Sequence, residues 1–256
     1  GLGDVYKRQT YLNNQYYGQF AEAGGTISKY HTRDIAYNLQ QILNYNETFG
    51  KHNVGLMVGH EYYQKKYYYL SGTKSKLFSY DNEELGGAVV DGAGAHSYID
   101  DYNSEGYFMR AQYDYAGRYF VSGSYRRDAS SRFPSGDLRW VFFPSVSVGW
   151  RISEENFWKE SSLDFIENLK IRASYGKTGY DDDLNYEFLT GFTYPSGGSI
   201  LGGDYVNGSV PKGIANKDIT WQTIKMFDIG LDFSAWNGKL GLTFDYFRRH
   251  RDGLYA

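Results

Sequence analysis

The chain has 256 residues, among them 27 Tyr, 16 Phe, 5 Trp and 31 Gly, and it contains no Cys. Without Cys there is neither a disulfide scaffold nor a thiolate metal site, and a formal net charge of −3 provides no basic field for nucleic acid. No apolar run approaches the roughly 18 residues that a membrane helix needs. The composition therefore favours a Tyr- and Gly-rich β protein that has no nucleic-acid partner.

The first nine residues do not begin with Met and lack the apolar core of a secretory signal peptide. They look like translated sequencing adapter, so we interpret residues 1–9 as non-native and residues 10–256 as the protein's own. The last residues, 253–256, fall in a segment that is still patterned as a strand. We therefore expect both ends to be cuts in a longer chain.

Strict alternation of apolar and polar residues, the pattern of a two-faced strand, recurs along the chain. It predicts strands over residues 33–48, 52–63, 107–115, 145–152 and 169–176. Gly50-Lys51 is expected to turn the first two strands into a hairpin. A three-residue loop over 116–118 is expected to pair Tyr115 with Tyr119.

Near the C-terminus, Asn237-Gly238 is a strong signal for a two-residue hairpin turn. The register that this turn sets pairs Phe233 with Leu242 and Leu231 with Phe244 on one face, and Asp232 falls on the other. A slip of one residue would place apolar side chains on the polar face. Turn chemistry and side-chain pattern thus predict the same register independently.

The connections between predicted strands differ in length according to the end at which they lie. They are short at 49–51, 116–118 and 237–238, long at 71–105 and 179–218, and intermediate at 129–140. Residues 153–167 fall on the short side, where Ser153 looks like the N-cap of a helix. Short turns at one end and long loops at the other are typical of an outer-membrane β-barrel. Residues 179–218 must then hold zero or two barrel strands, because the flanking strands run in opposite directions.

Tryptophan placement supports a membrane barrel. Trp140 lies at the long-loop end of its strand and Trp150 at the turn end, a separation of roughly 25 Å at ~3.3 Å per residue and a tilt near 40°. That is the height of the apolar band between two aromatic girdles. Trp236, beside the short turn, matches the periplasmic girdle, although buried Trp in a soluble core is the alternative.

Signals for catalysis or metal binding are weak, so we predict no catalytic residue, no cofactor and no metal site. The five His have no ligand spacing. Asp181-Asp182-Asp183 is either a solvated loop tip or a calcium site. Arg248-Arg249-His250-Arg251 is either an ordinary charged strand end or a site that attracts anionic lipopolysaccharide at the outer rim.

Three longer strings are more specific. They cover residues 125–133 (YRRDASSRF), 143–155 (FPSVSVGWRISEE) and 168–179 (NLKIRASYGKTG). Together they resemble the C-terminal barrel signature of SusC/RagA-type TonB-dependent transporters of the Bacteroidota. The resemblance extends to residues 50–53, 219–222 and 245–247, and departs from the family pattern at Ala129 and Tyr180.

The resemblance implies an all-β, antiparallel transmembrane barrel of 22 strands, of which this chain would supply about nine to eleven. It further implies a plug domain that contacts TonB, a SusD-like lipoprotein over the extracellular mouth, and a location in the outer membrane of a Gram-negative, Bacteroidota-like cell. The plug and the C-terminal strands would lie outside this chain. The implied function is non-enzymatic import of oligosaccharides, or of peptides in some relatives.

Two sets of residues are candidates for the transport path. Alternation predicts polar side chains that face the lumen at Arg110, Gln112, Asp114, Arg151, Arg172, Asp228, Asp232 and Asp245. Tyrosines in or beside the long 71–105 connection suit sugar stacking and hydroxyl hydrogen bonds; they are Tyr67, Tyr68, Tyr69, Tyr98 and Tyr102. The alternative for the whole chain is a soluble Tyr-rich β-sandwich that acts as a carbohydrate-binding or adhesion module, in which the apolar faces would be buried.

Overall fold

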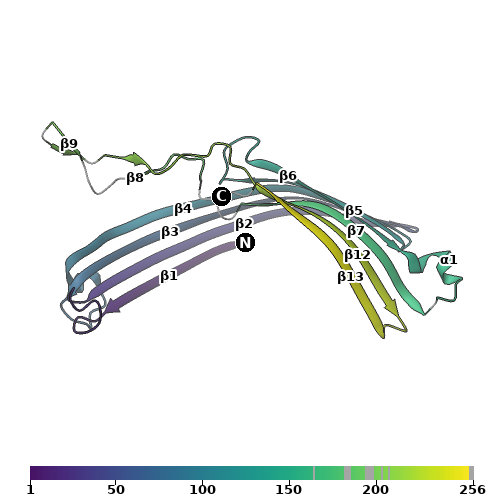
Figure 1. Cartoon of the computed structure of the whole chain (residues 1–256), viewed down its shortest axis with the longest axis horizontal. Coiled ribbons are helices and arrows are strands. Elements are labelled where there is room, and N and C mark those ends of the chain that lie inside the picture. The colour runs from purple at the N-terminus through teal and green to yellow at the C-terminus, as the bar shows by residue number, and fades with distance from the viewer. Residues whose placement is uncertain (164, 182–185, 194–198, 203, 207, 254–256) are drawn as a thin grey trace. The chain divides into compact units, whose positions relative to one another are not determined.

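The computed structural model describes residues 1–163, 165–181, 186–193, 199–202, 204–206 and 208–253. Nine strands form one antiparallel sheet in the order β1-β2-β3-β4-β5-β6-β7-β12-β13 (Figure 1). They are β1 (Leu2–Asn13), β2 (Thr26–Phe49), β3 (His52–Leu77), β4 (Ala88–Tyr115), β5 (Tyr119–Ser130), β6 (Trp140–Arg151), β7 (Ile166–Tyr180), β12 (Gln222–Ala235) and β13 (Leu240–Asp252). The predicted all-β, antiparallel class is confirmed.

The remaining elements are short. They are η1 (Leu85–Gly87), η2 (Ile152–Glu154), α1 (Asn156–Lys159), β8 (Phe192–Thr193), β9 (Ser199–Leu201), β10 (Asp204–Val206) and β11 (Val210–Pro211). β9 pairs with β10 and β8 with β11, in two separate small sheets. Because β7 pairs directly with β12, the stretch between them adds zero strands to the main sheet. No helix among the described residues is long and apolar enough to cross a membrane.

The chain divides into two compact units. Unit 1 comprises Gly1–Leu39 and Tyr62–Asn103, and unit 2 comprises Gln40–Glu61 and Ser104–Ala256. In unit 1, β1 pairs with β2 from Leu2↔Tyr37 to Asn13↔Thr26. This pairing does not test the origin of residues 1–9, which stays a prediction.

The predicted hairpins of unit 2 have the expected registers. Phe233 lies opposite Leu242, and Leu231 lies opposite Phe244. The Lys239 N–H donates to the Trp236 carbonyl at 3.3 Å, and Asn237 has φ 53° and Gly238 φ 74°, which are signs expected for a type I′ turn. The loop over 116–118 likewise pairs Tyr115 with Tyr119.

Two local predictions are wrong. Residues 71–105 are not a loop, because β3 continues to Leu77, β4 begins at Ala88, and only residues 78–87 connect them. Polar side chains and tyrosines occupy both faces there, so hydrogen bonding between strands is not accompanied by an apolar and polar alternation. Ser153 is not an N-cap either. It is buried within η2, and its hydroxyl has no hydrogen-bond partner among the described residues.

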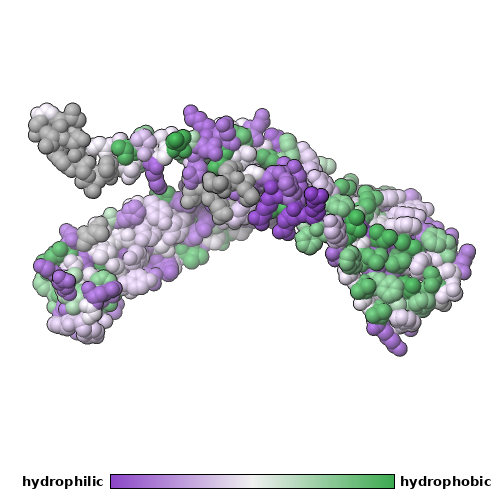
Figure 2. Space-filling model, viewed as in Figure 1, coloured by the Kyte–Doolittle hydropathy of each residue, from purple (hydrophilic) through white to green (hydrophobic). Residues whose placement is uncertain are grey.

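Each unit buries little. The buried cluster of unit 1 is Ile27, Leu77 and Ala88, and that of unit 2 is Phe133 and Ile219. In contrast, many large apolar side chains of unit 2 are exposed, for example Val146 at 50% and Phe244 at 62%. Figure 2 shows apolar side chains gathered where Figure 1 places the turn-proximal ends of β12 and β13. Exposure of this kind marks an interaction surface, and here the surface follows the predicted lipid face.

The β12–β13 turn provides a test of its backbone. Gly238 has φ 74°, whereas Gly241 does not have a positive φ, and a Cβ at either would have open space around it. We expect Gly238→Ala to cost about 1–2 kcal/mol of unfolding free energy, because left-handed backbone is strained for alanine. Gly241→Ala is the matched control, expected to be near neutral. Urea unfolding of the full-length protein in detergent measures both, and equal effects would contradict the turn geometry.

Candidate functional site

The strand registers place all eight predicted lumen residues on one face of unit 2. Residues directly opposite in a pair share a face, and Arg151, Lys170 and Asp232 are such partners across β6, β7 and β12. Because side chains alternate along a strand, this row decides which residues of β6, β7 and β12 lie on the same face. The β4–β5 and β5–β6 registers extend the same face to β5 and β4. We call the face that contains these eight residues the polar face, and the opposite one the apolar face. That the polar face points into a lumen stays a prediction.

Arg172 is the centre of an ion cluster that joins half of the predicted set. Its guanidinium lies 3.2 Å from Asp232 through Nε, 3.4 Å from Asp228 through Nη1 and 2.5 Å from Asp245 through Nη2. The three carboxylates come from β12 and β13, and the arginine comes from β7. One cation is therefore surrounded by three anions, which leaves the cluster with an excess of negative charge.

Gly230 makes this geometry possible. It lies directly opposite both Arg172 on β7 and Asp245 on β13. A Cβ at this position would lie 2.4 Å from Arg172 Cζ, so any larger side chain would occupy the space of the guanidinium. The Arg172 side chain passes over Gly230 on β12 and so reaches Asp245 on β13.

A second ion cluster on the polar face was not predicted from the sequence. Arg126 bonds Asp128 at 2.7 Å and Glu61 at 3.1 Å, and its guanidinium lies over the Phe108 ring at 5.3 Å. Arg126 and Asp128 are two residues apart on β5, a spacing that places both on one face. Glu61 lies on β3, and the sequence does not specify how β3 aligns with its neighbours. No sequence signal therefore places Glu61 beside Arg126.

Two other predicted residues border a groove of about 620 Å³ on unit 2, which is lined in part by Gln112 and Asp114. Asn53 donates from Nδ2 to Asp114 Oδ1 at 2.7 Å, and Asp114 also accepts from the Gly117 N–H at 3.1 Å. These carboxylate and amide groups form a polar, solvent-open surface near the short turns.

In unit 1, three of the five candidate tyrosines join a series of ring contacts. We define the tyrosine ladder as Tyr11, Tyr30, Tyr67, Tyr69 and Tyr98. Successive ring centroids are 5.6 Å apart for Tyr11–Tyr30, 6.3 Å for Tyr30–Tyr69, 5.0 Å for Tyr69–Tyr98 and 6.0 Å for Tyr67–Tyr98. These residues lie on strands, which corrects their predicted placement in or beside a loop.

A groove of about 620 Å³ runs along the ladder. Its lining residues are Lys7, Gln9, Tyr11, Asn13, Ser28, Tyr30, Thr32, Tyr67 and Tyr69. The other two candidates lie elsewhere: Tyr102 contacts the Tyr63 ring at 6.0 Å, and Tyr68 lines a smaller surface recess beside His31.

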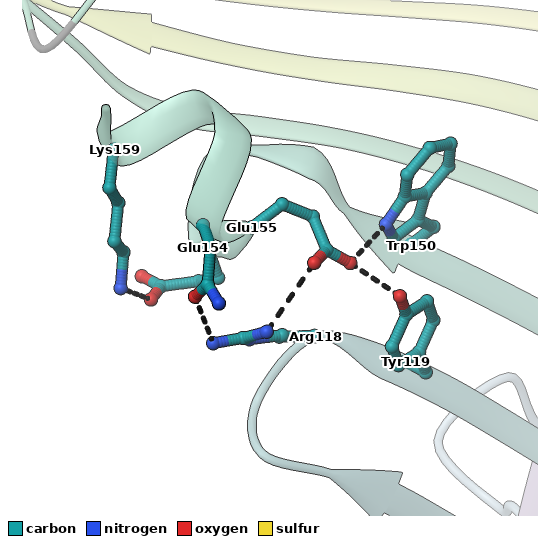
Figure 3. A network of polar contacts seen from close by, with 7 residues as sticks. Arg118, Tyr119, Trp150, Glu154, Glu155 and Lys159 are labelled. Atoms are coloured by element: carbon teal, nitrogen blue, oxygen red, sulfur yellow. Dashed lines mark hydrogen bonds and ion pairs between the residues drawn. The ribbon is translucent and has the colours of Figure 1, made fainter. Parts of the chain in front are cut away.

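At the turn end of unit 2, Glu155 links the start of β5, the end of β6 and the β4–β5 turn (Figure 3). Its Oε1 accepts from Tyr119 Oη at 2.5 Å and from Trp150 Nε1 at 3.0 Å, and its Oε2 lies 3.4 Å from Arg118 Nη1. The hydrogen bonds from Tyr119 and Trp150 hold the pKa of Glu155 below its usual range. Nearby, the Lys159 ammonium, 2.6 Å from Glu154, lowers the pKa of that carboxyl.

Among the described residues, no group of three His, Asp or Glu side chains is arranged to hold a metal ion. The possible calcium site was Asp181-Asp182-Asp183, and Asp182 and Asp183 lie outside the described residues. The described residues thus form three features. They are the polar and apolar faces of the sheet in unit 2, the tyrosine-lined groove in unit 1, and the Glu155 hydrogen-bond network at the turn end of unit 2.

Comparison with known proteins decides the family. The family model described as "TonB dependent receptor-like, beta-barrel" matches residues 2–256. The chain belongs to the TonB-dependent receptor β-barrel family. The SusC/RagA-type resemblance is confirmed, and so is the expectation of a non-enzymatic protein, because receptors of this family are transport proteins.

Curated TonB-dependent receptors share sequence with the chain. TonB-dependent receptor P3 of Formosa agariphila is 37% identical over 212 residues, which cover 81% of the chain and 20% of that protein. TonB-dependent receptor SusC of Bacteroides thetaiotaomicron is 30% identical over 249 residues, 95% of the chain and 23% of that protein. The chain thus spans about a fifth of the length of these relatives.

Solved structures agree on the fold. The structure of the RagAB peptide transporter matches with a TM-score of 0.85 and 21% identity, over 98% of the chain and 27% of that chain. The RagAB peptide importer in its open-open state matches at 0.80 and 22%, over 97% and 26%. The barrel fold of TonB-dependent receptors is therefore confirmed, and the β-sandwich alternative is wrong.

A double-mutant cycle tests how Gly230 supports the ion cluster of this receptor wall. We expect Gly230→Ala to displace the guanidinium and to destabilise the full-length protein about as much as Arg172→Gln, on the order of 1–3 kcal/mol. Once Arg172→Gln is present, Gly230→Ala should cost little more, since the clash is gone. Gly123→Ala, which has only an ordinary contact, is the control. Additive effects of the two changes would refute the contact.

The turn-end network predicts a pH dependence. Because the folded pKa of Glu155 is depressed, its contribution to stability is complete above the unfolded pKa of about 4.3 and is lost as pH falls through the lower folded value. Urea midpoints of the full-length protein, measured from pH 7 downward, should drop less steeply in Glu155→Gln than in wild type. Glu160→Gln, a change in an exposed neighbouring acid, should keep the wild-type slope.

Proposed function

We propose that this chain forms part of the wall of an outer-membrane β-barrel, and that the full-length protein imports oligosaccharides with energy transmitted by TonB. The observation that carries the proposal is the family match combined with a sheet whose two faces differ in chemistry through several consecutive strands. A lipid-facing apolar band opposite a polar interior is the defining pattern of transmembrane barrels.

The connections orient the wall. The β2–β3, β4–β5 and β12–β13 turns are short and lie at one end of their strands, and residues 152–165 connect β6 to β7 at that same end. The longer 181–221 connection lies at the other end. In outer-membrane barrels short turns are periplasmic and long loops extracellular, so the Glu155 network belongs to the periplasmic rim.

Aromatic side chains agree with that orientation. On the apolar face of β6, Trp140 and Trp150 stand at opposite ends. The Tyr107 ring stacks near Trp140, with centroids 6.1 Å apart, and Trp236 stacks on Phe165 at 5.5 Å. Aromatic girdles at both interfaces are expected where a barrel wall crosses the bilayer.

The length of the central strands suggests where a solute binds. β3 has 26 residues and β4 has 28, whereas a transmembrane strand needs only about 9–11. The strand segments of unit 1, with their tyrosines and with polar side chains on both faces, are therefore in excess of what the bilayer requires. We assign them to the extracellular side.

The tyrosine ladder favours a neutral, hydroxylated solute. Ring faces stack on the apolar faces of sugars, and phenolic hydroxyls provide hydrogen bonds at their edges. The other lining residues carry amides and hydroxyls, with Lys7 as the charged exception. Lys7 and Gln9 belong to the part that we propose is non-native, and the tyrosines of the ladder form the binding surface without them. An oligosaccharide fits this surface better than a charged peptide.

The partners follow from the same proposal. The apolar face contacts outer-membrane lipid, a SusD-like lipoprotein covers the extracellular mouth, and TonB acts through a plug domain. SusC of B. thetaiotaomicron and the RagAB peptide transporter are relatives by sequence and by fold. The peptide in the latter's description makes a peptide solute the alternative outcome.

Uptake by cells that carry the full-length protein tests the function. Radiolabelled oligosaccharides should accumulate, accumulation should disappear when the gene for TonB is deleted, and peptide mixtures should not compete. TonB-independent uptake would contradict the mechanism. Competition by peptides, but not by sugars, would show that the solute is a peptide. It would leave the proposal of TonB-dependent import unchanged.

Adjacent tyrosines test the ladder. We expect Tyr69→Ala to weaken oligosaccharide binding by the full-length protein about two- to tenfold, since aromatic contacts contribute about 0.5–1.5 kcal/mol. Tyr68→Ala, which removes the neighbouring ring from the other side of β3, should leave the affinity unchanged. Isothermal titration with purified protein measures both. An equal or larger loss in Tyr68→Ala would show that the ladder is not the binding surface.

A further inference from the structure

On the apolar face of unit 2, the polarity of β7, β12 and β13 changes abruptly from one row of opposed residues to the next. The rows, from the turn end outward, are Ile171–Leu231–Phe244, Ala173–Ile229–Tyr246, Tyr175–Phe227–Arg248 and Lys177–Lys225–His250. Two aliphatic-rich rows are thus followed by an aromatic row and then by a basic row. We call the last row, with Arg248, the basic row.

Among the described residues of unit 2, ion pairs balance only part of the positive charge in the basic row. Lys177 and Lys225 face each other directly, an arrangement of like charges that is destabilising without a counter-ion. Asp252 lies 2.7 Å from Lys225 and 2.8 Å from His250. No ion pair among the described residues involves Lys177 or Arg248. Among the described residues, Asp252 is thus the carboxylate paired with this row, and it contacts Lys225 and His250 only. The Lys177 ammonium lies 5.9 Å from the centroid of the Phe143 ring.

On the apolar face, Lys225, Arg248 and His250 of the basic row are exposed and Lys177 is half-buried. The side chain of Lys225 is 45% exposed and that of His250 68%. Hydrophilic side chains gather over the far end of β13 in Figure 2, which Figure 1 locates beyond its apolar portion. A ligand can reach these cations without entering the lumen.

The depth of the row matches a headgroup region. Along β12, Trp236 of the periplasmic girdle and Lys225 are separated by about 28 Å at ~3.3 Å per residue and a tilt near 40°. The apolar band of such barrels is about 25 Å tall. Lys225 therefore lies just outside the hydrocarbon, on the long-loop side, where lipid headgroups of the outer leaflet begin.

We propose that the basic row binds the phosphate groups of a phosphorylated glycolipid, of the lipid A type, in the outer leaflet. The inference rests on the proposed location of the chain in the outer membrane. Lysine ammonium groups attract anionic headgroups at a membrane surface, and two of them side by side can contact one phosphate from neighbouring strands. The rings of Tyr175 and Phe227, one row below, provide a flat apolar surface for the first segment of an acyl chain.

Lipid retention by the full-length protein tests the site. The purified protein is placed in phosphatidylcholine nanodiscs that contain either diphosphoryl lipid A or lipid A freed of both phosphates, and the lipids that remain bound are counted by native mass spectrometry. We expect wild type to retain the diphosphoryl form preferentially. We expect the K177Q/K225Q variant to retain about tenfold less of it. Equal retention of the two lipid forms by wild type would overturn the proposal without any variant.

A charge-matched variant controls for general electrostatics. K51Q/K239Q removes two exposed cations from the short turns at the other end, and it should retain diphosphoryl lipid A as wild type does. Loss in this variant equal to that in K177Q/K225Q would overturn the site. R248Q is a second probe, expected to reduce retention, if the double variant fails to assemble.

The two proposals fail separately. A protein absent from the outer-membrane fraction would contradict the proposed function and the lipid site together. A folded, heat-modifiable protein in that fraction that shows no phosphate preference would remove the lipid site alone. Inorganic phosphate at millimolar concentration should not displace the lipid, and displacement would assign the row to a free anion.

Discussion

Antiparallel pairing across β4, β5, β6, β7, β12 and β13 is the constraint on which both faces of unit 2 depend. In hydrocarbon, every backbone N–H and C=O must find a partner within the protein, and neighbouring strands satisfy that requirement. Because side chains alternate, the same register decides the surface chemistry, and a slip of one residue would exchange the two faces. Leu231 and Asp232 are consecutive in sequence, yet Leu231 faces Ile171 and Phe244 whereas Asp232 bonds Arg172.

Glycine extends what this register can build on the polar face. Gly230 lies under the Arg172 guanidinium, and Gly59 lies under Phe108, whose ring carbon would be 2.4 Å from a Cβ at that position. In both places a large side chain lies across a neighbouring strand instead of projecting away from the sheet. The wall can therefore hold ion clusters that span three strands, and the polar groups are partnered and kept close to the backbone. In the lumen that we propose, side chains held in this way would leave the cross-section open for a solute.

Much of this arrangement follows from the sequence, since its signals are local. Alternation along each strand and the Asn237-Gly238 turn together predicted the β12–β13 register and the shared face of the eight polar candidates. The contacts within that face were not predictable, because Arg172 meets Asp228 and Asp245 across 56 and 73 residues. Glu61 was missed for the same reason. The strand segments over 71–77 and 88–105 were predicted as a loop because both of their faces carry polar side chains and tyrosines, so the pairing of these strands leaves no periodic signal in the sequence.

The two ends of the strands complement each other in setting the depth of the wall. At the turn end, Tyr119 and Trp150 donate hydrogen bonds to Glu155, and Trp236 stacks on Phe165, so the side chains of the proposed periplasmic girdle are held by specific contacts. At the other end the basic row interrupts the apolar face at one level. A cation on the lipid face costs about 2–4 kcal/mol at the bilayer midplane and 0–1 near the interface. A shift of the wall toward the periplasm would bury Lys177 and Lys225 in hydrocarbon. A shift toward the cell exterior would move the indole rings of Trp150 and Trp236 into hydrocarbon. The same few side chains that mark the two boundaries therefore hold the wall at one depth.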